Sequence, residues 1–376
     1  MQKIKFHEPF ITGNEINYIQ QVIESNHFSG DGPFTKKCHE LFENRWNFKK
    51  CLMTHSGTGA LEMAALLLDI SPNDEVIVPS YTFSTSALAF QRQGAKIIFA
   101  DVHRSHPCLD ESGLEKLITV RTKAIVAVHY AGVSCNMDLI TSLSQKYNLA
   151  VVEDAAQAIG GFYKEKPLGG LGNIGCYSFH ESKNIHCGEG GMLVINDDGL
   201  AGRAEIIRDK GTNRSDFFQG KVKKYECVDL GSSFLASDLQ ASFLFAQLEK
   251  IDFLLEKRNK LWNLYYDLLY KEDQFECPKI PQYARHNAHV FYILTQDTNE
   301  RNKLIKFLNS NGITAVFHYQ SLHKSPFFRT ENQSLKLPNS DKFTNCLLRL
   351  PLHHKLSDSD VKRVAETVKK FYRAVK

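Results

Sequence analysis

The sequence predicts a layered α/β fold with a mostly parallel central sheet, followed by a smaller C-terminal α+β domain. Short apolar runs alternate with helical patterns between about residues 50 and 200, which is typical of buried parallel strands joined by helices. A long helical pattern then covers residues 237–269, and strands and helices alternate again beyond it. The length of 376 residues also favours two domains over one.

The predicted strands of the large domain are short, continuous apolar runs: KCLMT, EVIVPS, KIIFADV, KAIVAVHY, LAVVEDA and GCYSF. Helical patterns follow the first two, in TGALEMAALLLD and TFSTSALAFQRQG. This order predicts βαβ crossovers. Because ligands of such sheets bind at the carboxyl ends of the strands, we expect the functional site there.

The helical pattern of residues 237–269 is expected to form one bent helix or two, leading from the large domain to the small one. We expect the large domain, with the N-terminal segment, to span residues 1–250 and the small domain to span residues 251–376. Strands are predicted at HVFYIL and TAVFHY, with a helix at NERNKLIKFLNSNG between them. Ser357 and Asp360 are expected to cap the last helix.

Composition excludes several classes of partner. The net charge of +4 is too small for a nucleic-acid-binding protein, and no apolar run is long enough to span a membrane. The nine cysteines form neither a CxxC pair nor a Cys/His cluster with zinc spacing. We therefore expect reduced thiols, a cytoplasmic protein and no metal site.

Two residues indicate covalent cofactor chemistry. Lys183, in HESKN, follows a predicted strand and precedes a glycine-rich turn, a setting that an ordinary surface lysine does not need. Asp154 ends the run LAVVED, where a carboxylate requires a positive partner such as a protonated pyridine nitrogen. Helix capping or a turn is the ordinary alternative for Asp154. Pyridoxal 5'-phosphate requires both a lysine for the Schiff base and an acid for its ring nitrogen.

The same cofactor requires a phosphate site. The small residues around Gly57 and Thr58 lead into a helix whose first amides can bind an anion, although an ordinary capped helix would look the same. Ser178 can add a hydroxyl to this site, and Phe83 can stack on the pyridine ring unless it is simply a core residue. The match GLGNIG to a dinucleotide fingerprint precedes a strand and opens no helix, so we set it aside.

Several segments together carry a family resemblance: EDAAQA, SFHESKN, GEGGMLVIND and FHYQSLH. The chain resembles the DegT/DnrJ/EryC1/StrS sugar aminotransferases, a branch of the fold-type I pyridoxal-phosphate enzymes, from about residue 8 to residue 370. The resemblance implies pyridoxal 5'-phosphate as the cofactor. It implies that Lys183 is the Schiff-base lysine and that Asp154 contacts the ring nitrogen. Gln157 would lie near the ring hydroxyl and Phe83 against the ring. The phosphate would be bound by Gly57, Thr58 and Ser178.

The resemblance also implies the partners. These are L-glutamate as amino donor, a dTDP-linked 4-keto-6-deoxy sugar as acceptor, and a second copy of the chain in a homodimer with shared active sites. In the family, a strip matching GSSFLASD reaches the phosphate of the neighbouring subunit. Most relatives carry Asn and Arg there, whereas this chain has Ser233 and Leu235, so Ser232 or Ser233 would have to replace that contact.

The residues that hold the sugar nucleotide are less defined. Candidates are Phe34 in the loop that begins at Asp31, Arg214, and His318 and Tyr319 with the nearby His323, although each histidine could equally be structural. Alternative functions are a 3-amino or gluco-epimer sugar aminotransferase and a regulatory or binding protein that keeps the fold without turnover. A sugar dehydratase would have histidine in place of Lys183. An amino-acid enzyme would usually bind its substrate carboxylate with a C-terminal arginine, for which Arg349 qualifies if it points inward.

Overall fold

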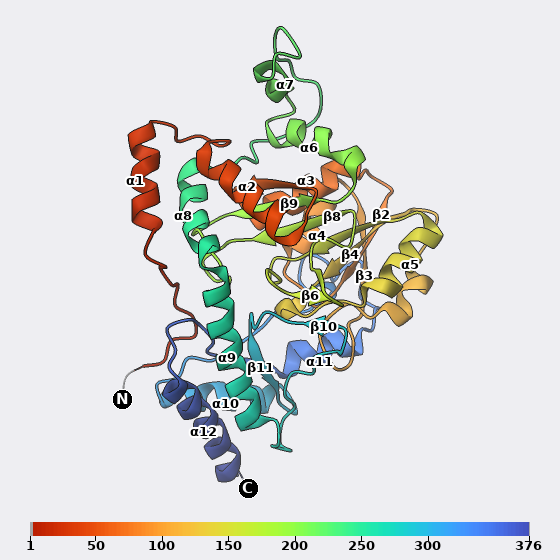
Figure 1. Cartoon of the computed structure of the whole chain (residues 1–376). Coiled ribbons are helices and arrows are strands. Elements are labelled where there is room, and N and C mark those ends of the chain that lie inside the picture. The colour runs from red at the N-terminus through yellow and green to blue at the C-terminus, as the bar shows by residue number, and fades with distance from the viewer. Residues whose placement is uncertain (1–2, 376) are drawn as a thin grey trace.

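The computed structural model describes residues 3–375, and its centre is a seven-stranded sheet (Figure 1). The strand order is β1-β9-β8-β5-β4-β2-β3, and only β9 runs antiparallel to the others. The strands are β1 (Lys50–Thr54), β2 (Glu75–Pro79), β3 (Lys96–Ala100), β4 (Thr122–Val128), β5 (Ala150–Asp154), β8 (Ile174–Ser178) and β9 (Gly191–Ile195). The six predicted runs are all strands of this sheet, which confirms the α/β prediction.

Helices cover both faces of the sheet because successive strand residues point to opposite sides. In β2, Ile77 belongs to one buried cluster, while Val76 and Val78 belong to the other. The first cluster packs against α2 (Pro33–Trp46), α5 (Met137–Tyr147) and α8 (Asp238–Glu249). The second packs against α3 (Gly57–Leu67), α4 (Thr85–Gln91) and α6 (Ala201–Arg208).

The long helical pattern is two helices, α8 and α9 (Ile251–Leu269), which meet at Lys250. Lys250 has φ −108° and ψ 16°, outside the helical range, and the chain changes direction there. Ser237 and Gln240 form a capping box that fixes the start of α8. The domain boundary that we propose, between residues 250 and 251, falls at this break.

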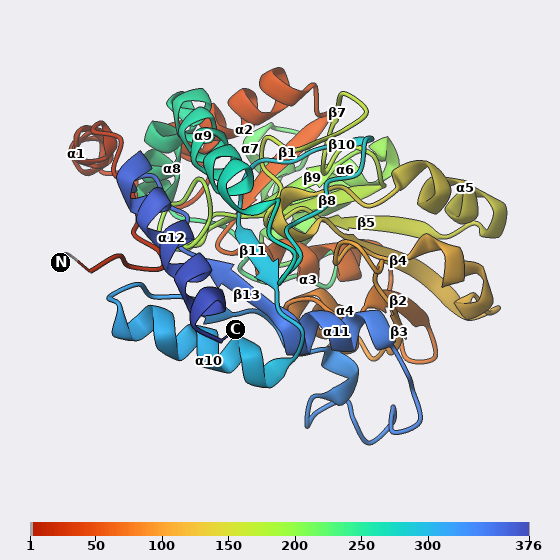
Figure 2. The ribbon, with the colours of Figure 1, turned by 90° about the horizontal axis from the view of Figure 1, so that it is seen from below.

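The C-terminal part contains a three-stranded sheet in the order β11-β13-β12, seen beneath the large sheet in Figure 1 and from below in Figure 2. Its strands are β11 (Phe291–Leu294), β12 (Val316–Phe317) and β13 (Leu347–Leu350). The helices around it are α10 (Thr298–Ser310), α11 (Pro338–Cys346) and α12 (Asp358–Val375). Ser357 and Asp360 exchange hydrogen bonds at the start of α12, which confirms the predicted cap.

Two segments join the parts of the chain. The sheet β10-β6-β7 pairs β6 (Phe162–Tyr163) and β7 (Lys166–Pro167) with β10 (Ala284–Arg285) from beyond α9. The N-terminal segment starts on the small domain, where Ile4 bridges to Ile313, and continues to α1 (Glu15–Ser25), which lies against α8. The short helix α7 (Arg214–Phe218) belongs to the part of the chain between α6 and α8. This part, here called the excursion, projects beyond α6 (Figure 1).

The remaining short helical turns are η1 (Glu111–Leu117), η2 (Tyr130–Gly132), η3 (Asp198–Leu200) and η4 (Leu322–Lys324). Within the described residues, no helix combines the length and the apolar character needed to cross a bilayer.

Candidate active site

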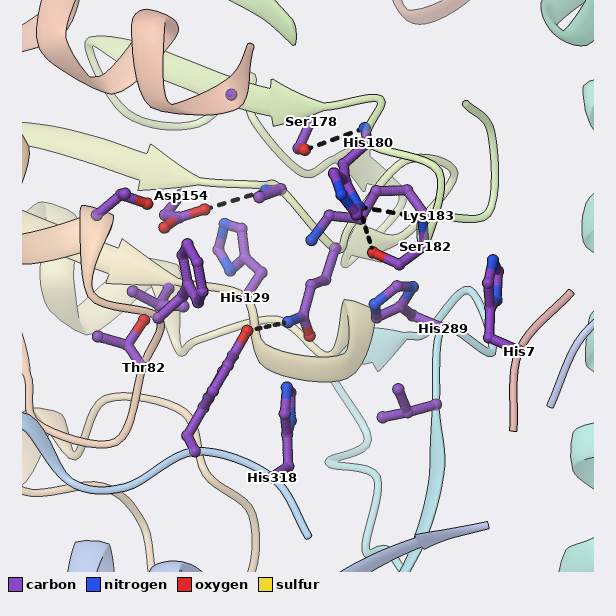
Figure 3. Close-up of a pocket in the computed structure, with 18 of the residues that line it drawn as sticks. His7, Thr82, His129, Asp154, Ser178, His180, Ser182, Lys183, His289 and His318 are labelled. Carbon is purple, nitrogen blue, oxygen red and sulfur yellow. Dashed lines mark hydrogen bonds between the residues drawn. The ribbon is translucent and has the colours of Figure 1, made fainter. Parts of the chain in front are cut away.

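A cavity of about 620 Å³ lies at the carboxyl ends of the parallel strands, between the large and small sheets. This is the position predicted for an α/β sheet, and the volume falls in the range of small-molecule sites. Figure 3 shows Asp154, Ser178 and Lys183 on one side of the cavity, and His289 and His318 entering from the other. Nine of the predicted site residues line the cavity: Gly57, Thr58, Phe83, Asp154, Gln157, Ser178, Lys183, His318 and Tyr319.

Lys183 lies in the loop after β8, and its side chain reaches into the cavity. Its backbone N–H donates to the carbonyl of His180 (2.9 Å), which closes a tight turn. Burial lowers the pKa of the amine from 10.5 to about 8, and the positive charge of Arg349 acts in the same direction while Asp154 opposes it. A lysine with such a pKa has a substantial neutral fraction near physiological pH, as a nucleophilic amine requires.

Asp154 is the last residue of β5 and is only 5% exposed. Its Oδ2 accepts a hydrogen bond from Ser86 Oγ (2.6 Å), and its Oδ1 accepts one from the N–H of Ala156 (3.1 Å). Ser86 Oγ is in turn 2.8 Å from Thr82 Oγ1. Neutral donors therefore orient this carboxylate, and no cation of the described chain forms an ion pair with it. Such a charge suits a protonated ring nitrogen of a ligand in the cavity.

The start of α3 and the end of β8 form a cup of small residues. Ser56 caps α3 by accepting from the N–H of Gly59 (3.0 Å), while the first amides of the helix have no partner inside it. A Cβ on Gly57 would lie 2.8 Å from Ser178 Cβ, so glycine allows the close approach that places Ser178 beside the helix start. Amides, hydroxyls and a helix N-terminus together suit a phosphate.

Gln157 and Tyr319 connect the large domain to the loop after β12. Gln157 Oε1 accepts from the N–H of Ala131 (2.7 Å), and its Nε2 donates to the hydroxyl of Tyr319 (2.9 Å). Tyr319 adopts φ +34°, an unusual backbone conformation for a bulky residue, and the Phe83 ring lies 6.0 Å from its own. Burial raises the pKa of Tyr319, so its hydroxyl stays protonated and can donate.

His318 is held as a neutral acceptor or donor on the opposite wall. Its Nδ1 hydrogen-bonds with the hydroxyl of Tyr130 (2.5 Å), and its carbonyl accepts from Tyr81 (2.7 Å). Burial lowers the pKa of His318, and the charges of Arg349 and Lys183 lower it further. The neighbouring candidate His323 lies outside the cavity, where its Nδ1 is 2.7 Å from Ser80 Oγ.

Two predicted substrate contacts do not reach this cavity. The Phe34 ring is 4% exposed and packs against Tyr18 and Phe245, because the first turn of α2 faces α8. Arg214 starts α7 and pairs with Asp209 (2.9 Å) on the projecting excursion. Neither residue lines the wall of the cavity in its own chain, and their assignment to the substrate stays a prediction.

Ser233 also lies outside the cavity of its own chain. It is exposed and bridges to Asp209, while Leu235 bridges to Thr54 at the end of β1. Next to it, Phe234 stacks on His55 (6.0 Å), one residue before the α3 cap. The strip thus runs along the sheet edge that carries the phosphate cup.

Several lining residues were not predicted from the sequence. They come from the N-terminal segment, the loop before α4, the ends of β4 and β8, and the small domain: Phe6, His7, Thr82, Thr85, His129, His180, Ser182, Arg258 and His289. Arg349 points inward, as the alternative of an amino-acid enzyme required. The only local sequence signal for these residues is a polar side chain beside a predicted strand, as at His129 and His289.

The pocket fits pyridoxal phosphate in three separate features. A lysine amine of lowered pKa, a carboxylate without a protein cation and an anion cup face one cavity of suitable size. These features and the sheet order define the class of the protein, a fold-type I pyridoxal-phosphate aminotransferase.

Known aminotransferases are similar to this protein over nearly the whole chain. The DegT/DnrJ/EryC1/StrS aminotransferase family model matches residues 9–369. An uncharacterized protein of Methanocaldococcus jannaschii is 32% identical over 370 residues, which cover 96% of each chain. The aminotransferase TlmJ of Streptoalloteichus hindustanus superposes with a TM-score of 0.92 at 27% identity, covering 100% of each chain. The putative sugar aminotransferase Spr1654 of Streptococcus pneumoniae, in its PMP form, gives 0.91 at 26%, covering 99% of this chain and 100% of its own.

The chain belongs to the DegT/DnrJ/EryC1/StrS aminotransferase family. It is a pyridoxal-phosphate-dependent sugar aminotransferase, and Spr1654 has also been solved in a PLP form.

Proposed function

We propose that this enzyme transfers the amino group of L-glutamate to C4 of dTDP-4-dehydro-6-deoxy-D-glucose. The product would be dTDP-4-amino-4,6-dideoxy-D-galactose, for a surface polysaccharide such as lipopolysaccharide or enterobacterial common antigen. One observation carries the chemistry: the amine of Lys183, of lowered pKa, faces the same cavity as Asp154. The choice of sugar rests on the resemblance of VHYAGVSCNMD, GTNRSDFF and LGSSFLASDLQ to dTDP-4-amino-4,6-dideoxygalactose transaminase.

The protein residues would act in two half-reactions that share one site. Bound pyridoxal phosphate supplies an electron sink conjugated to the substrate nitrogen, and Asp154 keeps its ring nitrogen protonated. Lys183 Nζ, which faces the cavity, would take the proton from the α-carbon of the donor in the first half-reaction. In the second half-reaction the same amine would deliver a proton to C4 of the sugar. The kinetics are expected to be ping-pong.

His318 and Tyr319 are the residues that we assign to the sugar. Both lie on the small-domain wall of the cavity, and both are neutral hydrogen-bonding groups. Neutral donors and acceptors suit the hydroxyl and keto oxygens of a sugar. Phe83, 53% exposed in the cavity mouth, remains the candidate for stacking on the cofactor ring.

We further propose a homodimer in which Ser233 of one subunit completes the phosphate site of the other. Ser233 is exposed beside the sheet edge that carries the cup. Large apolar side chains gather on the adjoining excursion, where Phe218, Val228 and Leu230 are at least half exposed. A cytoplasmic location is proposed as well, since each of the nine cysteines is unpaired.

The test of the substrate is incubation with glutamate and a panel of 3-keto and 4-keto nucleotide sugars, followed by determination of the product configuration by NMR. An axial 4-amine on the dTDP sugar supports the proposal. An equatorial 4-amine, a 3-amine, or a strong preference for a UDP or GDP sugar overturns the substrate assignment alone. No turnover of any sugar, with no colour from bound cofactor, would indicate the non-catalytic alternative.

A further inference from the structure

A cluster of one histidine and two carboxylates lies outside the cavity, in and just after the loop that follows β3. His103, Asp110 and Glu111 each offer one ligand atom, and these atoms lie within 4.8 Å of one another. None of the three residues lines the cavity. The expectation of no metal site rested on the spacing of the cysteines, and none of these residues is a cysteine.

The backbone of the loop brings the two ends of the cluster together. Val102 forms an antiparallel β-bridge with Leu109, and the N–H of His103 donates to the carbonyl of Cys108 (2.9 Å). His103 on one side of the loop is therefore held opposite Asp110 on the other side. The short distances between the ligand atoms follow from this closure and do not depend on long, flexible side chains.

Neutral donors orient both carboxylates. Asp110 Oδ1 accepts hydrogen bonds from the N–H (3.0 Å) and the hydroxyl (2.7 Å) of Ser112. Glu111 Oε1 accepts one from the side-chain amide of Asn136 (3.0 Å), and Glu111 Oε2 lies 2.6 Å from Nε2 of His103. Hydrogen bonds of this kind orient the ligands of metal sites. The second oxygen of each carboxylate is left for an ion, which would replace the proton between Glu111 and His103.

His106 is a separate indication that the protein alone does not complete this cluster. It is 5% exposed, and its ring stacks on that of His103 with the centroids 4.6 Å apart. Its Nδ1 is 3.0 Å from the hydroxyl of Ser105, whereas its Nε2 is buried and has no hydrogen-bond partner in the described part of the chain. Burial lowers the pKa of His106 to about 4, and His103 acts in the same direction while Glu111 and Asp110 oppose it. A neutral, unpartnered ring nitrogen beside two carboxylates suits a metal ion.

We propose that His103, Asp110 and Glu111 bind one divalent transition-metal ion, with Zn²⁺ as the best match, and that His106 is a further ligand. Imidazole together with carboxylate suits zinc, whereas Mg²⁺ and Ca²⁺ prefer oxygen ligands alone. The two carboxylates balance the charge of the ion. Ligand atoms at about 2.0–2.2 Å from zinc lie roughly 3.3 Å from one another, so small side-chain movements are sufficient.

The site would be structural, because its loop secures a contact between the two domains. Asp101, at the base of the loop, accepts hydrogen bonds from the N–H and the hydroxyl of Ser340 (both 2.7 Å) and from the N–H of Asn339 (3.1 Å). Ser340 and Asn339 belong to the first turn of α11 in the small domain. An ion that fixes the loop would therefore stabilise the attachment of α11 without entering the reaction.

Calorimetric titration of the chelator-treated holoenzyme with zinc chloride tests the site. We expect one Zn²⁺ per chain, and no binding of Mg²⁺ or Ca²⁺ at the same concentrations. Asp110→Asn and Glu111→Gln keep the shape of each side chain and remove its charge, and each should weaken zinc binding by at least about tenfold. His106→Ala should also weaken it, by a smaller factor.

Glu115→Gln is the matched control, because Glu115 lies in the same turn η1 but pairs with Lys146 (2.6 Å) outside the cluster. It should leave zinc affinity unchanged. Thermal unfolding provides a second readout, in which saturating zinc should raise the Tm of the wild type and of Glu115→Gln by roughly 2–5 °C. The same concentration should not raise the Tm of Asp110→Asn. Unfolding of the metal-free proteins shows whether each variant is folded.

Anomalous diffraction at the zinc edge locates the ion without any variant. A single peak between His103 and the two carboxylates is expected. No zinc binding, a peak only in the cavity, or unchanged affinity in both Asp110→Asn and Glu111→Gln would overturn the proposal. Unchanged affinity in His106→Ala would remove His106 from the ligand set. None of these readouts involves turnover, so their outcome does not depend on the proposed function.

Discussion

Two residues define the chemistry, and each can be tested through its charge. Burial lowers the pKa of Lys183 to about 8 in the folded protein. Between about pH 8 and 10.5 the unfolded chain therefore holds more of this proton, so the contribution of Lys183 to stability rises with pH. Below about pH 8 the buried amine is charged, and its desolvation lowers the free energy of unfolding of the cofactor-free protein by the full amount.

We expect cofactor-free Lys183→Met to be more stable than the cofactor-free wild type at pH 7, by up to about 3 kcal/mol. The difference should shrink as the pH approaches the ordinary pKa of lysine. Urea unfolding of both proteins across this pH range measures it. A stability difference that stays constant with pH would mean that the amine is not desolvated.

Asp154→Asn keeps the shape of the side chain and removes the charge that faces the cavity. We expect turnover to fall by about 10²- to 10³-fold, as for other losses of a preorganised charge. Ser86→Ala, which removes one 2.6 Å hydrogen bond to the same carboxylate, should have a smaller effect of about tenfold or less. Steady-state kinetics of the two variants give the comparison, and equal effects would show that the charge itself is not what matters.

At this scale, the sequence was informative where a functional residue directly follows a buried strand. Asp154 and Ser178 end their strands, and Lys183 lies just beyond one, so all three were predicted to face the ligand. Ser86 could not be assigned in this way, because its role depends on a contact with Asp154, which is far away in the chain. Phe34 was expected in a loop, whereas α2 starts at Pro33 and buries the ring.

At the scale of elements, the phosphate cup depends on how closely β9 approaches the start of α3. A Cβ on Gly191 would lie 2.4 Å from the carbonyl oxygen of Ser56 and 2.6 Å from the N–H nitrogen of Gly57. These are backbone atoms, so they can move only by displacing the cup. The turn GEGG after Lys183 therefore needs glycine for two reasons. Gly191 packs against the cup, and Gly188 has a positive φ of 79°.

Gly191→Ala is expected to destabilise the protein by about 1–3 kcal/mol and to weaken cofactor retention. The control is Gly202→Ala in α6, where an added Cβ meets nothing within 4 Å. That change should be neutral or stabilising by up to about 1 kcal/mol. Thermal unfolding and cofactor content after gel filtration measure both effects, and equal behaviour of the two variants would contradict this account of the cup.

At the scale of the whole molecule, the proposed shared site makes each subunit depend on its neighbour. We expect sedimentation to show a dimer. Mixing inactive Lys183→Arg chains with Ser233→Glu chains should restore activity, because the hybrid contains one site with an intact Lys183 and an intact neighbouring Ser233. Random exchange predicts recovery of about one quarter of the wild-type activity. An active monomer, or mixtures that recover nothing, would rule out this arrangement.

Six of the seven strands and the layered α/β architecture were predictable because strand periodicity and crossover rules act locally. The N-terminal segment was not, because its short run carries no periodic pattern, and its position follows from pairing with residues 312–314. The cavity between the two domains likewise required the full structure. Apart from Arg258, its small-domain wall is assembled from residues more than 100 positions after Lys183.

Borohydride reduction followed by peptide mass spectrometry tests the central claim most directly. Reduction of the holoenzyme is expected to attach the pyridoxyl group to Lys183. Incubation with L-glutamate before reduction should abolish this label, and later addition of the keto sugar should restore it. A label on another lysine, or a label on Lys183 that responds to neither substrate, would contradict the claim that Lys183 carries the amino transfer.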